Sequence, residues 1–453
     1  MKKVNTIVLL LMLPLSLMSF SDTDNKPKTL DINPVSTLKQ YVGEYEMQGV
    51  TIDIYTKDND TKLYLFVFGQ PEYELVETGQ HKFSFKVSDD YKVEFKNLEN
   101  SVFKELILIQ PDGTYRATRS LESENTMEAY DKKLIDIGFS GVVLVAQNDS
   151  ILFNKAYGRK NNQENGLNDI NTVFDICSIT KQFTAAGILK LSMQNKVSVN
   201  DKLSKYFDAI PDDKKNITIH QLLTHSSGLV DAIGGDYDAI TEAAFLNQVF
   251  SSELLSPVGT AFNYSNVGYS LLTLIIEKAS GIDYETFLNE NIFKPSKMNH
   301  TGYVIPNWGI NEVANGFLDG NEAKKPNEEN WSDNSPYLNL KGNGGILSSA
   351  SDMLLWSKAI RDHTVLDEAT TSKYLYPHFK SDGFAYNYYG YGWGIENNDS
   401  ENKLVQHGGT SALFATDLWM YPKKGITIIV LSNKYEDHVY SIARKFSKFL
   451  LEK

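Results

Sequence analysis

The sequence predicts a small all-β domain followed by a larger α+β domain, and two observations carry this prediction. Residues 38–119 contain short strands that alternate apolar and polar residues, with turns about every eight to twelve residues, as in a small antiparallel barrel or sandwich. Beyond residue 122, strand patterns at both ends enclose long apolar helices. That order indicates an α+β layer domain in which the terminal strands share one sheet.

Length and composition exclude several classes of protein. A chain of 453 residues has room for about two or three domains. Hydrophobic residues make up 42% of it and charged residues 22%, which is ordinary for a globular protein and excludes wholesale disorder. The formal net charge of −13 argues against nucleic acid as a partner, because gripping a phosphate backbone requires clustered Lys and Arg.

Cysteine and histidine usage limits the possible metal and redox chemistry. Cys177 is the only cysteine, so the chain has no intramolecular disulfide and no thiolate metal cluster. The eight histidines are scattered and show no His-Glu-x-x-His pattern. A metal site built from scattered His, Asp and Glu stays open, but nothing in the sequence signals one. We expect no metal and no organic cofactor.

The N-terminus has the pattern of an export signal. Lys2 and Lys3 precede a strongly apolar run over residues 4–20, and small residues around Ser21 offer a cleavage site. The run is short for a membrane span, so we expect no stable span after cleavage, with an uncleaved anchor as the alternative. Residues 1–21 are assigned to a signal peptide and residues 22–37 to a linker, which predicts the bacterial periplasm or the extracellular space.

The strands of the first block are expected at residues 50–54, 63–68, 83–87, 93–95 and 106–109, with turns at 58–60 and 111–113. In the second block, a hairpin is expected from residues 141–145 and 151–157. Long helices are expected over 180–195 and 268–280, and the second of them should stop at Gly281. Two strands over 415–421 and 426–432 and a final helix over 440–451 complete the expected elements.

Ser178 and Lys181 form the first candidate catalytic pair. The Ser-x-x-Lys spacing also occurs at Ser36, Ser101 and Ser400, but only Ser178 opens a long apolar helix. A three-residue step places Lys181 one turn above the serine on the same helix face. The helix N-terminus also favours negative charge developing at the serine. The alternative is a serine N-cap followed by a solvated lysine.

Tyr264 and Asn266 form the second candidate motif. A tyrosine hydroxyl can relay a proton between nucleophile and leaving group when a neighbouring cation lowers its pKa. An asparagine amide can orient a substrate and a lysine together. The alternative is a buried tyrosine beside an asparagine cap, and the same spacing recurs at Tyr337 and Asn339.

The third motif is the run His407, Gly408, Gly409 and Thr410 beside predicted strands. Two glycines let a substrate backbone approach closely. The Thr410 N–H can act as an oxyanion donor together with that of Ser178. A plain Gly-Gly turn is the alternative reading.

In order and context, these motifs resemble the penicillin-recognising serine hydrolase superfamily, which includes class C-type β-lactamases, D,D-peptidases, D-aminopeptidases and esterases. The runs 222–229, 342–349 and 391–394 also look like signatures of that family, and the resemblance covers about residues 125 to 450. It implies a β-lactamase/transpeptidase-like domain over 122–453, with an antiparallel sheet, helices on both its faces and an all-helical subdomain.

The block over 38–119 resembles the small lipocalin-like domain that is often fused to exported serine hydrolases. The residues that carry this likeness are Leu38, Tyr41, Gly43 and Tyr45. In those proteins the domain usually follows the enzyme, whereas here it precedes it. We expect a packing or substrate-limiting module.

Four further features have structural readings. His225 is expected to be a hydrogen-bonded core histidine, and Ser349 and Ser351 a turn and helix cap. The aromatic run 384–393 is expected to pack strands, although it can also line a cleft. Cys177 is expected to be packed and inert, because no activating base is visible for it.

The resemblance implies a two-step acyl transfer. Ser178 attacks a carbonyl, and Lys181 and Tyr264 share the general-base and general-acid work, with either able to take the serine proton. Asn266 and residues 407–410 hold the substrate or the oxyanion. The expected substrate is a small ester, a peptide that includes D-residues, or a peptidoglycan-type molecule.

Two alternatives stay open: a true β-lactamase, and a non-catalytic binding protein that retains the fold. His407 argues against the first. The β-lactamases of the resembling family usually carry lysine at this position, whereas a histidine with a pKa of about 6.5 is mostly uncharged at neutral pH.

Overall fold

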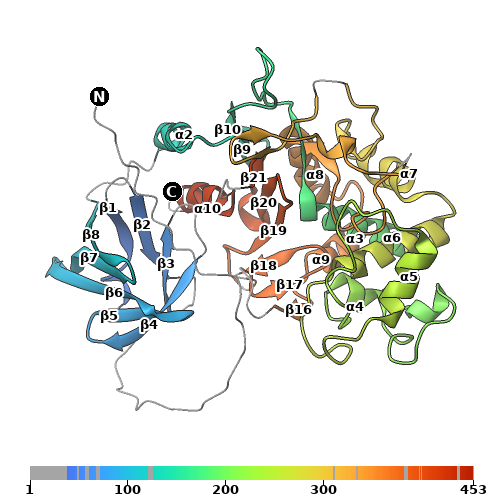
Figure 1. The fold of residues 1–453 in the computed structure, drawn as a ribbon, viewed down its shortest axis with the longest axis horizontal. Helices are drawn as coiled ribbons and strands as arrows, with labels where there is room; N and C mark the ends of the chain where they lie inside the picture. Colours follow the sequence, from blue (N-terminus) through green and yellow to red (C-terminus); the bar gives the residue numbers. More distant parts are fainter. Residues whose placement is uncertain are drawn as a thin grey trace. The chain divides into compact units, whose positions relative to one another are not determined.

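The computed structural model describes residues 38–47, 50–56, 61–67, 72–120, 126–309, 312–332, 335–381, 386–396, 398, 400–435 and 439–451. The predicted signal peptide (1–21), the linker (22–37) and the turn at 58–60 lie outside these residues. The chain divides into two compact units, Met1–Glu124 and Asn125–Lys453, which are described separately (Figure 1).

The first unit is a closed antiparallel barrel of eight strands, each paired with the next in sequence. Pairing of Tyr45 with Arg119 and of Glu46 with Thr118 joins the first strand to the last. The strands are β1 (Gly43–Met47), β2 (Val50–Tyr55), β3 (Leu63–Val67), β4 (Tyr73–Gly79), β5 (Lys82–Phe85), β6 (Ser88–Glu99), β7 (Val102–Gln110) and β8 (Gly113–Arg119). The barrel fits the predicted lipocalin-like architecture.

Apolar side chains fill the interior of the barrel, as expected for eight strands. Aromatic rings dominate one part of this core. Tyr41 stacks on Phe103 with ring centroids 5.1 Å apart, and Phe95 lies 4.7 Å from the same tyrosine. The Tyr45 hydroxyl donates to the Tyr41 carbonyl at 2.9 Å, which satisfies the polar end of a fully buried ring.

Several strand boundaries differ from the sequence expectation: β6 and β7 are longer than the expected 93–95 and 106–109, and β5 ends earlier than expected. Val87 was expected inside a strand, but β5 ends at Phe85 and the chain turns at residues 86–87 before β6 begins. The Lys86 N–H donates to the Glu74 carbonyl at 2.9 Å, and the Val87 side chain is 58% exposed. The apolar alternation continues through this turn in sequence, so the pattern alone placed the strand end too late.

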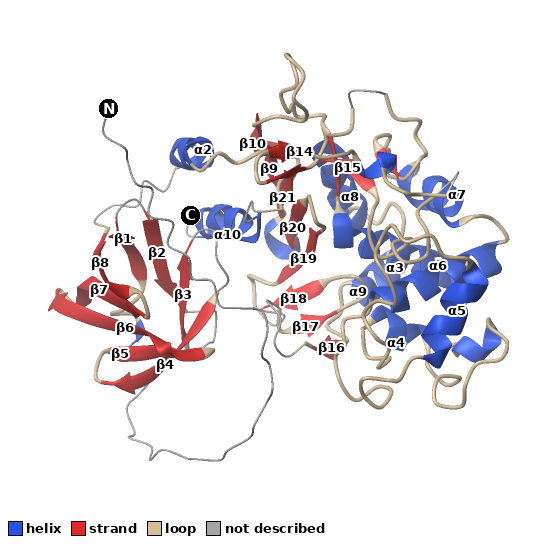
Figure 2. Ribbon diagram, viewed as in Figure 1, coloured by secondary structure: helices blue, strands red, loops and turns tan. Residues whose placement is uncertain are grey.

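The second unit is built on an eight-stranded antiparallel sheet in the order β10-β9-β21-β20-β19-β18-β17-β16 (Figure 2). Its first strands in sequence pair with its last, as expected, because β9 pairs with β21 over its whole length. The strands are β9 (Gly141–Gln147), β10 (Ser150–Tyr157), β16 (Phe379–Lys380), β17 (Tyr388–Tyr389), β18 (Gly394–Glu396), β19 (Leu404–Thr410), β20 (Ala415–Tyr421) and β21 (Ile426–Ser432).

Helices cover both faces of this sheet, which confirms the predicted α+β architecture. Ser357 of α8 (Ala350–Arg361) accepts a hydrogen bond from Thr427, whose strand partner is Met420. Met420 and Thr427 therefore lie on the same face of the sheet. Tyr421, which follows Met420 in β20, bonds to Ser447 of α10 (Val439–Leu451). Successive residues of a strand point to opposite faces, so α8 and α10 lie on opposite sides of the sheet.

A separate group of helices accounts for the helical subdomain (Figure 2). The remaining α-helices of the unit are α2 (Met127–Asp136), α3 (Thr180–Met193), α4 (Ile219–Leu223), α5 (Glu242–Ser251), α6 (Asn266–Ser280), α7 (Tyr284–Leu288) and α9 (Glu368–Tyr374). The short helical turns are η1 (Cys177–Ile179), η2 (Leu203–Lys205), η3 (Asn289–Phe293), η4 (Pro326–Glu328) and η5 (Pro422–Lys424). The short strands are β11 (Val173–Asp175), β12 (Thr301–Gly302), β13 (Phe317–Leu318), β14 (Asn321–Glu322) and β15 (Leu347–Ser349).

The start of α6 differs by two residues from the expectation. The helix was expected from Gly268, but it begins at Asn266 because the Ser265 hydroxyl caps it by accepting the Gly268 N–H at 3.0 Å. Its predicted stop is correct: Gly281 has φ of 80°, in the left-handed region that glycine adopts without strain.

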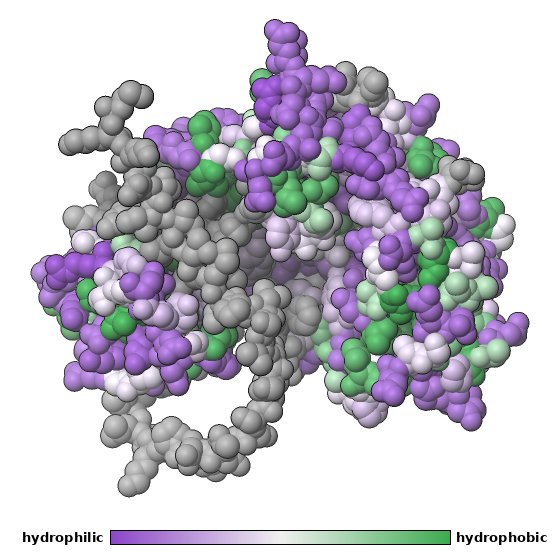
Figure 3. All heavy atoms as spheres, in the orientation of Figure 1, coloured by the Kyte–Doolittle hydropathy of each residue, from purple (hydrophilic) through white to green (hydrophobic). Residues whose placement is uncertain are grey.

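Polar residues dominate the visible surface of both units, and apolar side chains form small separate patches on it (Figure 3). Single exposed apolar residues such as Leu167 and Leu255, each 60% exposed, are ordinary on a protein surface. Within the described residues, no helix combines the length and the apolar character that crossing a bilayer requires.

Candidate active site

Ser178 lies in the single turn η1, which leads directly into α3. The turn is held by Asp175, whose Oδ1 accepts the Cys177 N–H at 2.7 Å. Cys177 has φ of 49°, a left-handed conformation that is uncommon for a non-glycine residue. Ser178 is partly exposed, so its hydroxyl is accessible from solvent at the start of a helix.

Lys181 is fully buried, one turn along α3 from the serine, and its Nζ has three acceptors. It donates to Ser178 Oγ at 3.1 Å, to Asn266 Oδ1 at 2.6 Å and to the Asn343 carbonyl at 2.7 Å. Burial lowers the pKa of Lys181 to about 7, although the negative charges of two nearby aspartates oppose the shift. The Ser178–Lys181 pair is therefore brought together, and a large share of the lysine is neutral near pH 7.

Tyr264 lies beside this pair. Its ring centroid is 4.8 Å from Lys181 Nζ, and the phenol hydrogen-bonds to Ser178. The role expected of Tyr264 from the sequence depends on a neighbouring cation that lowers its pKa. Instead, removal of its hydroxyl from water raises the pKa, and the hydrogen bond to Ser178 offsets only part of that rise. Tyr264 is thus protonated at neutral pH and suited to donate a proton.

Asn266 connects Lys181 to a carboxylate that the sequence motifs did not include. Its Oδ1 accepts from Lys181, and its Nδ2 donates to Asp231 Oδ1 at 2.9 Å. Asp231 lies two residues beyond the signature run 222–229. This closeness to the run is the only sequence signal that could have pointed to Asp231. The Asn343 carbonyl was also missed, because a backbone acceptor leaves no trace in residue identity.

His407 lies on β19 and is buried rather than open to the site, with 3% of its surface exposed. Nδ1 donates to the Gly408 carbonyl at 2.6 Å, so Nε2 is the acceptor for the Tyr389 hydroxyl at 2.9 Å. Burial and the charge of Lys181 lower the pKa of His407 to about 3. The ring is neutral at neutral pH, in agreement with the expected lack of a fixed charge.

Gly409 brings β19 into direct contact with the serine turn. A Cβ at this position would lie 2.7 Å from Ser178 N, from the Ile176 carbonyl oxygen and from Cys177 Cβ. Only glycine permits this approach without a backbone shift. The next residue, Thr410, is exposed at the end of the strand, and Gly408 pairs with Asp417 of β20.

His225 is the hydrogen-bonded core histidine that the sequence predicted. It is fully buried, and its Nδ1 accepts the Ser265 N–H at 3.0 Å. Its ring lies against Tyr264 with centroids 4.2 Å apart. Burial lowers its pKa well below the usual value, and its Nε2 has no hydrogen-bond partner within the described part of the chain. The residue therefore belongs to the support of the site.

The expectations for Cys177 and Ser349 are confirmed, whereas Ser351 lies within α8 and does not cap it. Cys177 is buried, and burial raises the pKa of its thiol well above the usual value, which makes it unreactive. Ser349 caps α8 by accepting the Asp352 N–H at 3.2 Å. In the aromatic run, residues 384 and 385 lie outside the described range, while Tyr389 and Trp393 are fully buried and pack the sheet edge.

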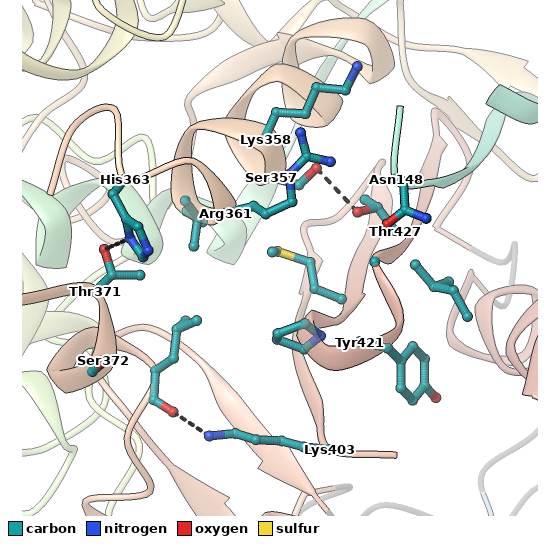
Figure 4. A pocket seen from close by; sticks show the side chains of 16 residues that line it. Asn148, Ser357, Lys358, Arg361, His363, Thr371, Ser372, Lys403, Tyr421 and Thr427 are labelled. Atoms are coloured by element: carbon teal, nitrogen blue, oxygen red, sulfur yellow. Dashed lines mark hydrogen bonds between the residues drawn. The ribbon is translucent and has the colours of Figure 1, made fainter. Parts of the chain in front are cut away.

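A pocket of about 380 Å³ lies away from these residues, between α8, α9 and the β20–β21 hairpin (Figure 4). Two pairs of its polar side chains bond to each other: Thr427 donates to Ser357, and His363 bonds to Thr371. No residue of the three motifs lines it. Among the described residues, no group of three or more His, Cys, Asp or Glu side chains is arranged to hold a metal ion.

Comparison with known proteins agrees with this geometry. The family described as Beta-lactamase matches residues 126–451. Penicillin-binding protein 4* of Bacillus subtilis (strain 168) is 30% identical over 320 residues, which cover 67% of this chain and 70% of that protein.

A second relative and a solved structure extend the comparison. Protein flp of Staphylococcus aureus (strain MW2) is 30% identical over 324 residues, covering 66% of this chain but only 60% of flp. The crystal structure of a penicillin binding protein from Bacillus halodurans matches with a TM-score of 0.61 at 26% identity, over 70% of this chain and 99% of that one.

Proposed function

Because this chain belongs to the β-lactamase family of serine hydrolases, we propose that it is an exported enzyme that forms an acyl-enzyme on Ser178. The observation that carries the proposal is the buried Lys181 amine, 3.1 Å from Ser178 Oγ and with a pKa lowered to about 7. A neutral amine at this distance is a competent general base for a serine hydroxyl. Export itself rests on the signal pattern over residues 1–21.

The proposed acylation begins when neutral Lys181 accepts the Ser178 proton while Oγ bonds to the substrate carbonyl carbon. The carbonyl oxygen becomes an oxyanion, which the N–H groups of Ser178 and Thr410 stabilise. Collapse of this intermediate breaks the bond to the leaving group, which takes a proton from Tyr264, and Lys181 returns a proton to the phenol. Water then hydrolyses the acyl-enzyme and releases the acid.

The protonation states support this division of labour between the two side chains. The raised pKa of Tyr264 keeps its proton available for the leaving group, whereas the lowered pKa of Lys181 makes the amine the base. Positioned acid–base groups contribute about 10²–10⁴-fold in rate. The close approach of Gly409 to Ser178 N supports an oxyanion site between η1 and β19, and one such donor contributes about 10²–10³-fold.

The proposed substrates are esters or peptides, with D-amino-acid amides and peptidoglycan-type peptides among them. Neutral His407 supplies no fixed positive charge for a substrate carboxylate. This argues for the ester or peptide reading over a true β-lactamase. The names of the relatives refer to penicillin binding, which makes a β-lactam a suitable second probe of the serine.

Covalent labelling followed by intact-mass measurement tests the proposal. A fluorophosphonate should add one label to the wild-type protein, peptide mapping should locate it on Ser178, and Ser178→Ala should prevent it. If the fluorophosphonate labels Ser178 and, in a separate experiment, a penicillin also forms an adduct that persists, the acyl-enzyme formed from β-lactams is hydrolysed slowly. Wild-type protein that takes up neither probe would instead be the non-catalytic binding protein, and labelling that persists in Ser178→Ala would place the nucleophile elsewhere.

A further inference from the structure

Asp231 lies in the loop between α4 and α5, outside the three catalytic motifs, and it is tied closely to the start of α6. Its Oδ1 accepts both the backbone N–H of Asn266 at 3.2 Å and the side-chain Nδ2 of the same residue at 2.9 Å. Its backbone carbonyl accepts the Val267 N–H at 3.0 Å. Three hydrogen bonds therefore join this loop residue to the first turn of the helix that carries Asn266.

These bonds determine which way the Asn266 amide faces. A carboxylate can only accept hydrogen bonds, so it turns the Nδ2 group toward Asp231. The amide oxygen must then face the opposite direction, where Lys181 Nζ lies at 2.6 Å. A rotated amide would turn its N–H groups toward Nζ, and the lysine N–H would lose this acceptor in either protonation state. Asp231 thereby selects the one amide orientation that can hold the lysine.

The same carboxylate also affects the charge of the lysine. Burial lowers the pKa of Lys181, and the negative charges of Asp231 and Asp236 raise it. The pKa of Asp236 is itself raised by burial and lowered by Lys181. The other ionisable groups near the lysine are uncharged near pH 7: His225, His407, Tyr264, Tyr269 and Cys177.

We propose that Asp231 is a positioning residue for acylation, acting through the Asn266 amide to hold Lys181 Nζ beside Ser178 Oγ. The proposal rests on the proposed acyl-enzyme function. A purely structural role also exists, because the carboxylate satisfies a backbone donor in the first turn of α6. The test must therefore measure something that loss of a helix contact alone would leave unchanged.

Three variants separate positioning from charge. Asp231→Ala removes both the charge and the acceptor, so the Asn266 amide is free to rotate. Asp231→Asn keeps an acceptor of similar shape but removes the charge. Asp236→Asn is the charge control, because Asp236 also acts electrostatically on Lys181 but makes no hydrogen bond to Asn266 among the described contacts.

The primary measurement is the rate of fluorophosphonate acylation from pH 5 to pH 10. Asp231→Ala should lower the plateau rate by about 10²-fold, the scale on which a misplaced group slows a reaction. Removing a negative charge disfavours the protonated amine, so both asparagine variants should move the acid limb of the profile to lower pH. Asp236→Asn should do so with a near wild-type plateau.

A direct reading of the lysine accompanies these rates. The pH titration of the Lys181 Cε signal in ¹³C NMR of lysine-labelled protein reports the state of this buried amine without any acylation of the serine. It should show a lower midpoint in Asp231→Asn than in wild type. Circular dichroism confirms that each variant is folded, and the near-isosteric Asp231→Asn keeps the test decisive if Asp231→Ala does not fold.

The results distinguish failure of this proposal from failure of the proposed function. If wild-type Ser178 is labelled and both Asp231 variants match its rate and its pH midpoint, the positioning role is wrong and the acyl-enzyme stands. If wild-type Ser178 is not labelled, the acyl-enzyme is wrong. The midpoint of the Lys181 NMR titration then decides alone, and an unchanged value in Asp231→Asn overturns the link between Asp231 and Lys181.

Discussion

The protonation state of Lys181 depends on its burial, which lowers the pKa of the amine, and on the groups that surround it. Its amine has three acceptors and no exposed surface, and its pKa is lowered to about 7. As the pH falls through this value, the amine takes up a proton and can no longer accept one from Ser178. The active form is therefore the one present above pH 7.

We predict that kcat/KM for a short-chain aryl ester rises with pH along an acid limb centred near 7. Lys181→Ala and Tyr264→Phe should each lower kcat by about 10²-fold or more, since each removes one proton-transfer group. Steady-state kinetics of the purified variants check this. Near wild-type turnover in both variants would contradict the assigned mechanism.

His225 supports Tyr264 from two directions. Its carbonyl accepts the Asn263 N–H at 2.7 Å, its Nδ1 accepts the Ser265 N–H, and its ring packs on the tyrosine between them. It also has φ of 56°, a left-handed conformation that asparagine tolerates better than alanine.

We predict that His225→Ala lowers the free energy of unfolding by about 1–3 kcal/mol, because a buried N–H loses its acceptor. His225→Asn should lose less, since asparagine offers an acceptor and adopts the same backbone conformation. Urea denaturation measures both values. Equal losses in the two variants would mean that side-chain volume, and not the hydrogen bond, accounts for the effect.

The buried, neutral His407 leads to a prediction about substrates. Without a fixed positive charge at this position, we expect measurable hydrolysis of short-chain aryl esters or D-amino-acid amides, and slow or absent hydrolysis of β-lactams. Parallel assays with an aryl ester, a D-amino-acid amide and nitrocefin provide the comparison. Rapid nitrocefin turnover without esterase or peptidase activity would make this protein a β-lactamase.

Residue identity and spacing pointed to three side chains that the structure brings together, but not to the residues that support them. Ser178, Lys181 and Tyr264 stand out because a helical step and an ordered set of motifs single them out. Asp231 lies in a loop without periodicity, and the Asn343 contact is made by a backbone carbonyl. Such positions become visible only when chain segments far apart in sequence meet.

At the scale of elements, the contact between β19 and η1 is controlled by one glycine. Gly409 lies where a methyl group would collide with backbone atoms of the serine turn, whereas the nearest atom to a Cβ on Gly408 is 3.6 Å away. The two adjacent glycines thus provide a matched pair for substitution.

We predict that Gly409→Ala lowers the free energy of unfolding by about 1–3 kcal/mol, because the turn or the strand must shift. Acylation of Ser178 should slow with it. Gly408→Ala should change stability by less than about 0.5 kcal/mol, as expected for ordinary van der Waals contact. Chemical denaturation of both variants tests this, and a larger loss in Gly408→Ala would contradict the close-approach argument.

Only part of the elements could be predicted from the sequence: β1, β4, β8 and most of the shorter helices and strands were not expected, and β6 and β7 were expected too short. Alternation and helical periodicity gave β20, β21 and α10 to within a residue or so. The start of α6 was placed two residues late, because its cap is polar and carries no apolar signal. Val87 was assigned to a strand because an apolar residue in a turn continues the alternation by chance.

At the scale of the whole molecule, each unit has its own apolar core. The barrel core is formed by residues between Tyr41 and Ala117, and that of the second unit by residues between Val142 and Leu431. All three candidate motifs belong to the second unit. This separation indicates that each unit holds the contacts needed for its own stability.

We predict that a chain beginning at Glu122 folds and still reacts with a fluorophosphonate at Ser178, with a substrate range that can be wider than that of the full chain. Intact-mass labelling and a panel of esters test this. A truncated chain that folds cooperatively but cannot be acylated would mean that residues 38–119 complete the active site.

The pairing of β9 with β21 has a consequence for how the protein is made. A ribosome adds about 5–20 residues per second, so β9 waits on the order of tens of seconds for its neighbour at the far end of the unit. Until then β9, the second strand of the sheet, is paired only with β10 and has an unoccupied edge, and such late, non-local pairing slows folding. The second unit therefore cannot complete its sheet until nearly all of its chain has been synthesised.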